Sequence, residues 1–206
     1  VAVILAECDR ARRKAETKED FLASINVIEQ QGNKMNTLIE QLLSLTRIQQ
    51  GTEKYPLRMC DLSGFVDACC DEFVPADERG MTLETDIEPG VAAAYNPSLL
   101  SRAMFNLMQN AYKYGREGGN IRVSLCRENG CAVISVKDDG PGIPKAEQEK
   151  IWQRFYRCDT SRAEGGTGLG LSLVREIALV HHARAEVVSA PGKGCDFRIV
   201  LPPVKN

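Results

Sequence analysis

The chain has 206 residues, of which 43% are hydrophobic, and its 26 basic and 28 acidic residues give a formal net charge of −2. This composition supports one or two folded domains with an apolar core, and the mixed charges offer no basic face for nucleic acid. No stretch approaches the roughly 18 consecutive apolar residues of a membrane span. The eight cysteines contain no CxxC pair and only two histidines accompany them, so we expect reduced cysteines and no zinc site.

Residues 1–50 are predicted to form an α-helical hairpin with a polar break at residues 12–20. The second helix carries a broad apolar stripe near the a and d positions of heptads. Its residues are Ile28, Met35, Leu38, Leu42 and Leu45, with Ile39 and Leu43 beside them. Such a stripe is typical of a four-helix bundle, and one hairpin supplies only two of the four helices, so we expect a homodimer. The alternative is that the hairpin packs on the downstream domain of its own chain.

A second domain is predicted for residues 57–206, because the periodicity changes after the polar segment 51–56. Helices are expected at 62–73, 98–114 and 169–181, and strands at 81–87, 121–127, 131–136, 185–189 and 195–201. Asn129 and Gly130 are typical of a tight hairpin between two of these strands. The pattern predicts an α+β fold, a two-layer α/β sandwich with helices on one face of a mixed, mostly antiparallel sheet.

Three polar residues, Asn106, Asn110 and Lys113, share one face of the helix predicted at 98–114, because their spacing is i, i+4, i+7. Amide oxygens can join phosphate and water oxygens around Mg²⁺, and an ammonium can neutralise phosphate charge. This face could hold a nucleotide triphosphate, and an ordinary solvated face would show the same pattern.

Asp138 follows a predicted strand and shares its inward face with Ile134 and Val136. A carboxylate at the rim of an apolar pocket can accept a hydrogen bond from the exocyclic amine of adenine. Gly140 and Gly142 would let the backbone approach a flat base closely. The alternative is a turn with solvated acids.

A glycine-rich segment, Gly165 to Leu171, opens the helix predicted at 169–181. Free backbone N–H groups and the helix dipole make such a terminus an anion site, so phosphates are expected there. A Rossmann loop would need an apolar strand directly before it, whereas residues 159–165 are polar, and the Walker A pattern is absent.

Four motifs, in this order, resemble the N, G1, F and G2 boxes of bacterial sensor histidine kinases. They are Asn106-x-x-x-Asn110-Ala111-x-Lys113-Tyr114, Asp138-x-Gly140-x-Gly142-Ile143, Ile151-Trp152-x-Arg154-Phe155-Tyr156-Arg157-x-Asp159 and GGTGLGL at 165–171. The resemblance covers nearly the whole chain and implies a Bergerat-type ATP site, a fold shared more distantly with gyrase. Departures from the commonest family pattern are Asn96, Gln109, Trp152 and Cys195, and none of them removes an expected ligand.

The resemblance implies a role for each matching residue toward ATP and Mg²⁺. It assigns Asn110, with Asn106, to the metal ion, and Lys113, Tyr114 and Arg157 to the phosphates. Asn110, Lys113 and Arg157 are thus the expected catalytic residues, and Asp138 would read adenine. The other expected nucleotide-binding residues, with Phe155 as the anchor of a mobile lid, are Gly140, Gly142, Ile143, Gly166, Thr167, Gly168, Leu169, Gly170 and Leu171.

The resemblance also implies the reaction, in which ATP phosphorylates a histidine that then passes the group to an aspartate of a response-regulator receiver domain. By the family's pattern the acceptor is expected a few residues upstream of Val1, so the chain would bind ATP without phosphorylating itself. His181 and His182 end a predicted helix and are expected to be structural. The chain is expected to be a cytoplasmic domain of a parent protein anchored in the bacterial inner membrane.

Two other functions fit the same sequence. One is a degenerate kinase that dimerises and docks a regulator without using ATP, against which the intact glycine motifs argue. The other is a different Bergerat-type ATPase, against which the kinase-like F box and the helical hairpin argue.

Overall fold

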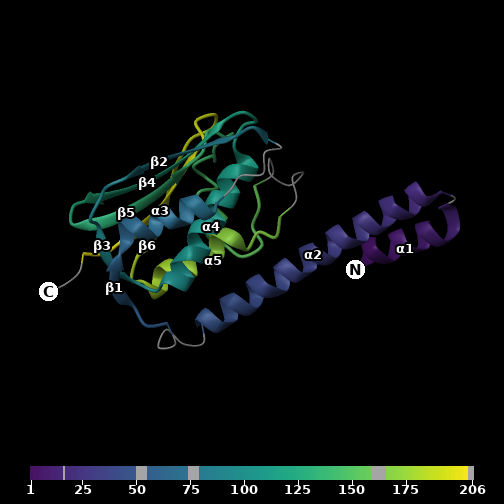
Figure 1. Cartoon of the computed structure of the whole chain (residues 1–206), viewed down its shortest axis with the longest axis horizontal. Helices are drawn as coiled ribbons and strands as arrows, with labels where there is room; N and C mark the ends of the chain where they lie inside the picture. Colours follow the sequence, from purple (N-terminus) through teal and green to yellow (C-terminus); the bar gives the residue numbers. More distant parts are fainter. Residues whose placement is uncertain (16, 50–54, 74–78, 159–165, 204–206) are drawn as a thin grey trace. The chain divides into compact units, whose positions relative to one another are not determined.

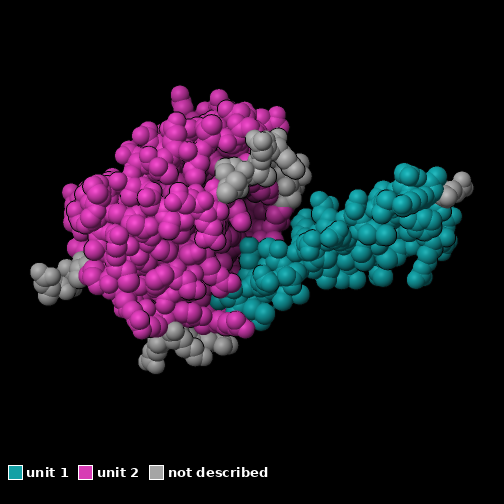
Figure 2. Space-filling model, in the orientation of Figure 1, with its two compact units in different colours: residues 1–44 teal, residues 45–206 magenta. Residues whose placement is uncertain are grey.

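The computed structural model describes residues 1–206 except 16, 50–54, 74–78, 159–165 and 204–206. The described chain forms two compact units, residues 1–44 and 45–206 (Figure 2). Most of the predicted linker, 51–56, lies outside the described residues. In the described part of the chain, no helix combines the length and the apolar character needed to cross a membrane.

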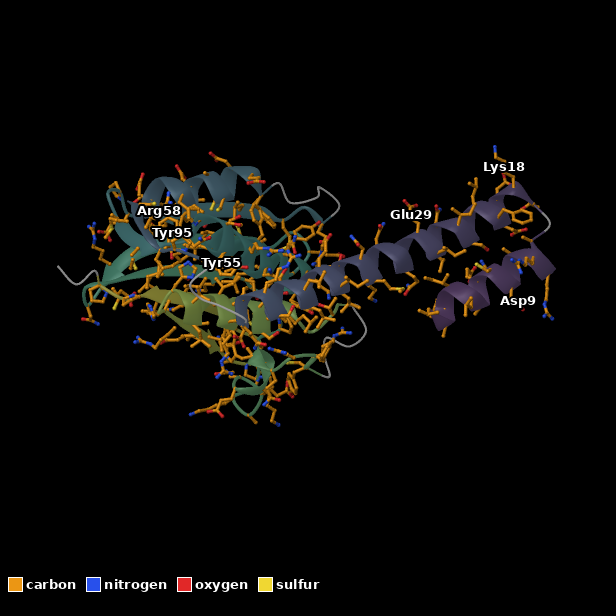
Figure 3. The ribbon with its side chains drawn as sticks, turned by 90° about the horizontal axis from the view of Figure 1, so that it is seen from below. Asp9, Lys18, Glu29, Tyr55, Arg58 and Tyr95 are labelled. Atoms are coloured by element: carbon orange, nitrogen blue, oxygen red, sulfur yellow. The ribbon has the colours of Figure 1, made fainter. Side chains whose placement is uncertain are left out.

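Two antiparallel helices make up the first unit, α1 (Ala2–Lys14) and most of α2 (Lys18–Gln49), and α1 lies beside the N-terminal half of α2 (Figures 1 and 3). A reciprocal cap begins α2, because Asp20 N–H donates to Thr17 Oγ1 at 3.1 Å and Thr17 N–H donates to the Asp20 carboxylate at 3.1 Å. These two hydrogen bonds satisfy amides that the first turn would otherwise leave free. The predicted helical hairpin is confirmed.

A five-stranded sheet, in the order β2-β4-β5-β7-β6, forms one layer of the second unit (Figure 1). Its strands are β2 (Thr82–Ile87), β4 (Asn120–Glu128), β5 (Cys131–Lys137), β6 (Arg184–Ser189) and β7 (Cys195–Leu201). β2 pairs with β4 in parallel and the other pairings in this sheet are antiparallel, which confirms the predicted mixed sheet. Asn129 and Gly130 connect β4 to β5 with φ values of 52° and 80°, as the predicted tight turn requires.

Three helices pack on one face of this sheet, α3 (Leu62–Glu72), α4 (Pro97–Tyr114) and α5 (Gly170–Val180) (Figure 1). The side-chain alternation of β4 explains the two layers, since Ile121 and Val123 are fully buried whereas Arg122 is exposed. A short 3₁₀ helix, η3 (Lys150–Trp152), packs against α5. The predicted two-layer sandwich is confirmed.

Two short strands, β1 (Arg58–Asp61) and β3 (Ala92–Tyr95), lie outside the predicted elements. They pair antiparallel as a separate two-stranded sheet, with Arg58 opposite Tyr95 (Figure 3). Alanine has a low β propensity, so the Ala-rich β3 carries little local signal for a strand. This sheet leads directly into α4, whose first turn is capped by Asn96, because Asn96 Oδ1 accepts the Leu99 N–H at 3.1 Å.

His181 follows α5 and is only 1% exposed. Its Nε2 accepts the Asn96 N–H at 3.0 Å, and its Nδ1 lies 2.7 Å from the carbonyl oxygen of Ile177, so Nδ1 carries the proton of a neutral ring. Burial lowers the pKa of this imidazole. The structural role predicted for His181 is confirmed, because both ring nitrogens are engaged with the backbone.

Candidate functional site

The polar face of α4 begins the site. Leu107 and Ala111 are fully buried against the core, whereas Asn106, Asn110 and Lys113 are partly exposed on the opposite side of the helix. Asn106 Nδ2 donates to the Arg102 carbonyl at 2.7 Å, and this bond fixes which end of the amide faces outward. The two faces of α4 are therefore divided as the helical spacing predicts.

The start of α5 lies against this polar face. A Cβ built on Gly170 would be 2.9 Å from Asn106 Oδ1, and a Cβ built on Gly166 would be 2.7 Å from Lys113 Nζ. Lys113 Nζ also lies 3.2 Å from the Tyr114 hydroxyl and 4.8 Å from the centroid of its ring. Two segments far apart in the sequence thus bring an amide oxygen, an ammonium and a phenol beside a glycine-rich backbone.

The glycine-rich segment presents its backbone for steric and conformational reasons. Gly168 has φ +70°, and a Cβ there would meet the Phe155 backbone at 2.8 Å. Leu169 is fully buried, and its N–H donates to Thr167 Oγ1 at 3.2 Å just before α5 begins. Leu171 is partly exposed in the first turn of α5. Gly165, the first residue of the predicted motif, lies outside the described residues.

Asp138 stands at the end of β5 and is 3% exposed, so it points inward as the strand alternation predicts. Its Oδ1 accepts the Gly140 N–H at 2.9 Å and the Cys195 N–H at 3.2 Å. Burial raises the pKa of this carboxyl group, and the two backbone hydrogen bonds partly oppose that rise. The site therefore contains a buried acceptor that is held by the turn after β5 and by the first residue of β7.

The turn after Asp138 is pressed onto neighbouring backbone. A Cβ on Gly140 would lie 2.3 Å from the Tyr114 carbonyl oxygen. Gly142 has φ +72°, and a Cβ there would lie 2.0 Å from the Ala190 carbonyl oxygen. Ile143 N–H donates to Ser189 Oγ at 2.8 Å, which ties the turn to the end of β6. The turn thus connects the end of α4 with the β6–β7 hairpin.

The segment between this turn and the glycine-rich loop is anchored through its backbone. Trp152 packs edge-on against Phe197 of β7, with ring centroids 6.0 Å apart. The Phe155 N–H donates to the Gly168 carbonyl at 2.9 Å, whereas its side chain is 60% exposed. Arg157 is partly buried just beyond it, and Asp159, the last residue of the predicted motif, lies outside the described residues.

Two charged residues to which the sequence assigned no role hold the end of α4 and the loop that follows it. Arg79 donates from Nη1 to the carbonyl oxygens of Tyr112 and Lys113, the latter at 2.6 Å, and from Nη2 to that of Gly115 at 2.8 Å. The Asp139 carboxylate accepts the N–H groups of Arg116 at 3.0 Å and Asn120 at 3.3 Å. Asp139 could have been suspected from its place beside Asp138, but nothing local in the sequence singles out Arg79.

Comparison with known proteins places this arrangement in a family. A model of the histidine kinase-, DNA gyrase B- and HSP90-like ATPases matches residues 95–205. The sensor histidine kinase RppB of Synechocystis sp. is 38% identical over 182 residues, which cover 86% of this chain and 40% of RppB. The sensor-like histidine kinase SenX3 of Mycolicibacterium smegmatis is 35% identical over 176 residues, which cover 84% of this chain and 46% of SenX3.

Solved structures agree with these matches. The mycobacterial sensor histidine kinase MprB is 28% identical with a TM-score of 0.62, covering 72% of this chain and 99% of the MprB chain. Full-length ShkA in complex with AMPPNP, 21% identical, shares the fold with a TM-score of 0.77 over 99% of this chain and 43% of its own. The chain spans less than half the length of RppB and SenX3. It belongs to the family of histidine kinase-, DNA gyrase B- and HSP90-like ATPases, and its resemblance to bacterial sensor histidine kinases is confirmed.

Proposed function

We propose that this chain is the ATP-binding part of a protein-histidine kinase of a two-component signalling system. In the full-length protein, the γ-phosphoryl group of ATP passes to a histidine and then to an aspartate of a response-regulator receiver domain. The observation that carries the proposal is the contact of the polar face of α4 with the glycine-rich segment that opens α5, where Asn106 Oδ1 lies against Gly170 and Lys113 Nζ against Gly166. A triphosphate held there would meet donors and cations on both sides.

Asn110 and Asn106 are the proposed Mg²⁺ ligands. The side-chain nitrogen of Asn106 is engaged with the Arg102 carbonyl, so its oxygen is the atom that faces the loop. Asn110 lies one helical turn further along the same face. Because Mg²⁺ keeps several waters and takes phosphate oxygens, one or two such protein oxygens fit its needs. The ion would offset the negative charge of the phosphates.

Asp138 is the proposed reader of adenine. Its buried carboxylate can accept a hydrogen bond from the exocyclic amine, and its two backbone donors keep it oriented for that contact. Gly140, Gly142 and Ile143 would line the base. At both glycines a Cβ would collide with neighbouring backbone. This group supplies selectivity for the base and takes no part in the transfer itself.

Transfer of the phosphoryl group asks mainly for positioning and charge neutralisation. Lys113, Tyr114 and Arg157 are the proposed phosphate contacts, and Asn110, Lys113 and Arg157 the proposed catalytic residues. Phe155 and the loop residues Gly166, Thr167, Gly168, Leu169, Gly170 and Leu171 are the proposed lid and phosphate cradle. Phe155 joins this cradle through its backbone bond to Gly168.

The helical hairpin is the proposed homodimer interface. Ten large apolar side chains of the first unit are between 36% and 73% exposed, a pattern that a second hairpin would cover in a four-helix bundle. They are Val1, Val3, Leu5, Phe21, Leu22, Ile25, Met35, Ile39, Leu42 and Leu43. Sedimentation equilibrium of the wild-type chain and of an Ile39→Glu variant measures this association. Dimers that persist unchanged in the variant would contradict the proposed interface.

A response regulator is the proposed protein partner. One structural neighbour, 20% identical with a TM-score of 0.78, is histidine kinase ThkA in complex with the response regulator protein TrrA. The proposal for this chain follows from the kinase reaction, which leaves a phosphohistidine that needs an acceptor.

Calorimetric titration with Mg²⁺ and AMPPNP tests the nucleotide site. Asp138→Asn and Asn110→Ala should each weaken binding by at least about tenfold, because each removes one charge-linked contact. Asp86→Asn is the matched control, since Asp86 is exposed and pairs with Arg122 at 3.2 Å. A folded wild-type chain that does not bind the nucleotide would overturn the proposed function.

A further inference from the structure

Arg79 forms an unusual cap on the end of α4. Its guanidinium donates to three carbonyl oxygens of the last helical turn and the residue after it, those of Tyr112, Lys113 and Gly115. The same group lies 5.7 Å from the centroid of the Tyr112 ring. The Arg79 carbonyl accepts the Gly118 N–H at 2.8 Å, so Arg79 is also hydrogen-bonded to the loop after the helix.

Elementary helix physics explains why this contact matters. The last four carbonyl groups of an α-helix have no intrahelical donor, and together they form the negative end of the helix dipole. A guanidinium offers five N–H groups in a planar fork, so one side chain can satisfy several of these carbonyls and complement their charge. The Gly115 N–H donates to the Ala111 carbonyl at 2.8 Å, and Arg79 donates to the next two carbonyls, those of Tyr112 and Lys113.

A second charged residue, Asp139, also holds the loop after α4. The Asp139 carboxylate accepts the backbone N–H groups of Arg116 and Asn120. Between these two clamps the Tyr114 carbonyl faces Gly140, where a Cβ would approach to 2.3 Å. The cation therefore holds the carbonyls that end α4, and the anion holds amides of the loop that follows.

The clamped turn carries the proposed phosphate contacts. Lys113 and Tyr114 both belong to it, and Lys113 Nζ is the atom that faces Gly166. Asp138 is held separately, by backbone groups of Gly140 and Cys195. Loosening the last turn of α4 would move the phosphate contacts while the adenine acceptor keeps its own supports.

We infer that Arg79 is a positioning residue for the triphosphate: it acts through the carbonyls of the last turn of α4 and sets where Lys113 and Tyr114 meet the phosphates. This inference rests on the proposed function, because it takes the site between α4 and the glycine-rich loop to be the phosphate site. It deepens that function by separating the recognition of phosphate from the recognition of the base.

The test compares two ligands on the wild-type chain, Arg79→Ala and Arg79→Lys. With Mg²⁺, AMPPNP should bind Arg79→Ala about tenfold more weakly, the size of effect expected when a charged contact is mispositioned. Adenosine, which has no phosphate, should bind within about twofold of the wild-type affinity. Arg79→Lys keeps the positive charge but loses the planar set of guanidinium N–H donors, so its AMPPNP affinity should lie between those of the wild-type chain and Arg79→Ala. Arg122→Ala, which removes an exposed guanidinium from β4, is the control and should bind both ligands normally.

A double-mutant cycle separates positioning from general damage. Because Arg79 acts through Lys113 and Tyr114, Arg79→Ala combined with Lys113→Ala should lose less AMPPNP affinity than the sum of the two single losses. Hydrogen exchange should quicken at residues 112–118 and stay unchanged in β5 and β7. Fully additive losses, or equal losses for AMPPNP and adenosine, would overturn the inference. If Arg79→Ala does not fold, the same ratio of affinities measured on Arg79→Lys decides, and an unchanged ratio there overturns it. A wild-type chain that binds neither ligand would instead count against the proposed function itself.

Discussion

Replacing Gly194 with alanine should destabilise the second unit much more than replacing Gly192, although both glycines lie in the β6–β7 turn with nearly equal φ angles. Their φ values are +72° and +74°, so either alanine is strained by about 1–2 kcal/mol in the left-handed region. The difference lies in the space around them. A Cβ on Gly192 meets nothing within 4 Å, whereas a Cβ on Gly194 would lie 1.9 Å from the Asp138 carbonyl oxygen.

The size of the effect follows from what must move. A backbone oxygen cannot swing aside as the tip of a side chain can, so the β6–β7 turn must separate from the end of β5. The two strands are joined there by Asp138 N–H to Cys195 O at 2.8 Å and Cys195 N–H to Asp138 Oδ1 at 3.2 Å. Overpacking and the loss of such hydrogen bonds each contribute about 1–3 kcal/mol. We expect Gly194→Ala to destabilise the unit by at least about 2 kcal/mol more than Gly192→Ala, and to weaken nucleotide binding as well.

Urea unfolding followed by tryptophan fluorescence measures this difference. Trp152 is the only tryptophan of the chain and packs on Phe197 of β7, so its signal reports the second unit. Stability changes should appear as shifted midpoints at an unchanged slope. Equal midpoints for the Gly192→Ala and Gly194→Ala variants would refute the reasoning, because the strain of the left-handed conformation would then be the whole effect.

Two further predictions concern the ends of α4 and α5. Asn96→Ala should lower the free energy of unfolding by about 1 kcal/mol, because it removes the side-chain oxygen that accepts the Leu99 N–H. Asn96→Asp keeps such an oxygen and should keep most of this stability. Equal unfolding midpoints for all three chains would contradict the prediction. Burial lowers the pKa of His181 in the folded chain, so the unfolded chain binds a proton at this residue more readily than the folded chain does. The contribution of neutral His181 to stability is therefore complete above the ordinary pKa of about 6.5 and is lost as the pH falls below it. His181→Gln should therefore flatten the fall in stability between about pH 7.5 and pH 5.5, and an unchanged slope in urea melts would show that other groups cause it.

Most of the secondary structure could be predicted because its signals are local. The 3.6-residue period of α4 and α5 and the alternation of β4, β5 and β7 each lie within one segment. β1 and β3 escaped prediction because each has four residues and depends on the other for its hydrogen bonds. The parallel pairing of β2 with β4 was equally beyond reach, since strand order depends on packing between segments that are distant in sequence.

The site divides in a similar way. The inward position of Asp138 could be predicted, because strand alternation is a local signal. The lid role of Phe155 stays a prediction; its side chain is exposed, and its backbone N–H donates to the Gly168 carbonyl. Arg79 could not be predicted, because its partners are backbone carbonyls, which every residue possesses and no sequence pattern marks.

The sequence by itself determined the periodic elements, the two-layer class of the second unit and the family motifs, because periodicity, turn residues and glycine spacing are properties of neighbouring residues. Tertiary structure alone decided which backbone groups meet. It brought Gly166 and Gly170 against Lys113 and Asn106, pressed the turn at Gly142 onto β6, and set Arg79 on the end of α4. The physical reason is that hydrogen bonds and close contacts depend on distance in space, and only the packing of helices on the sheet brings such distant segments together.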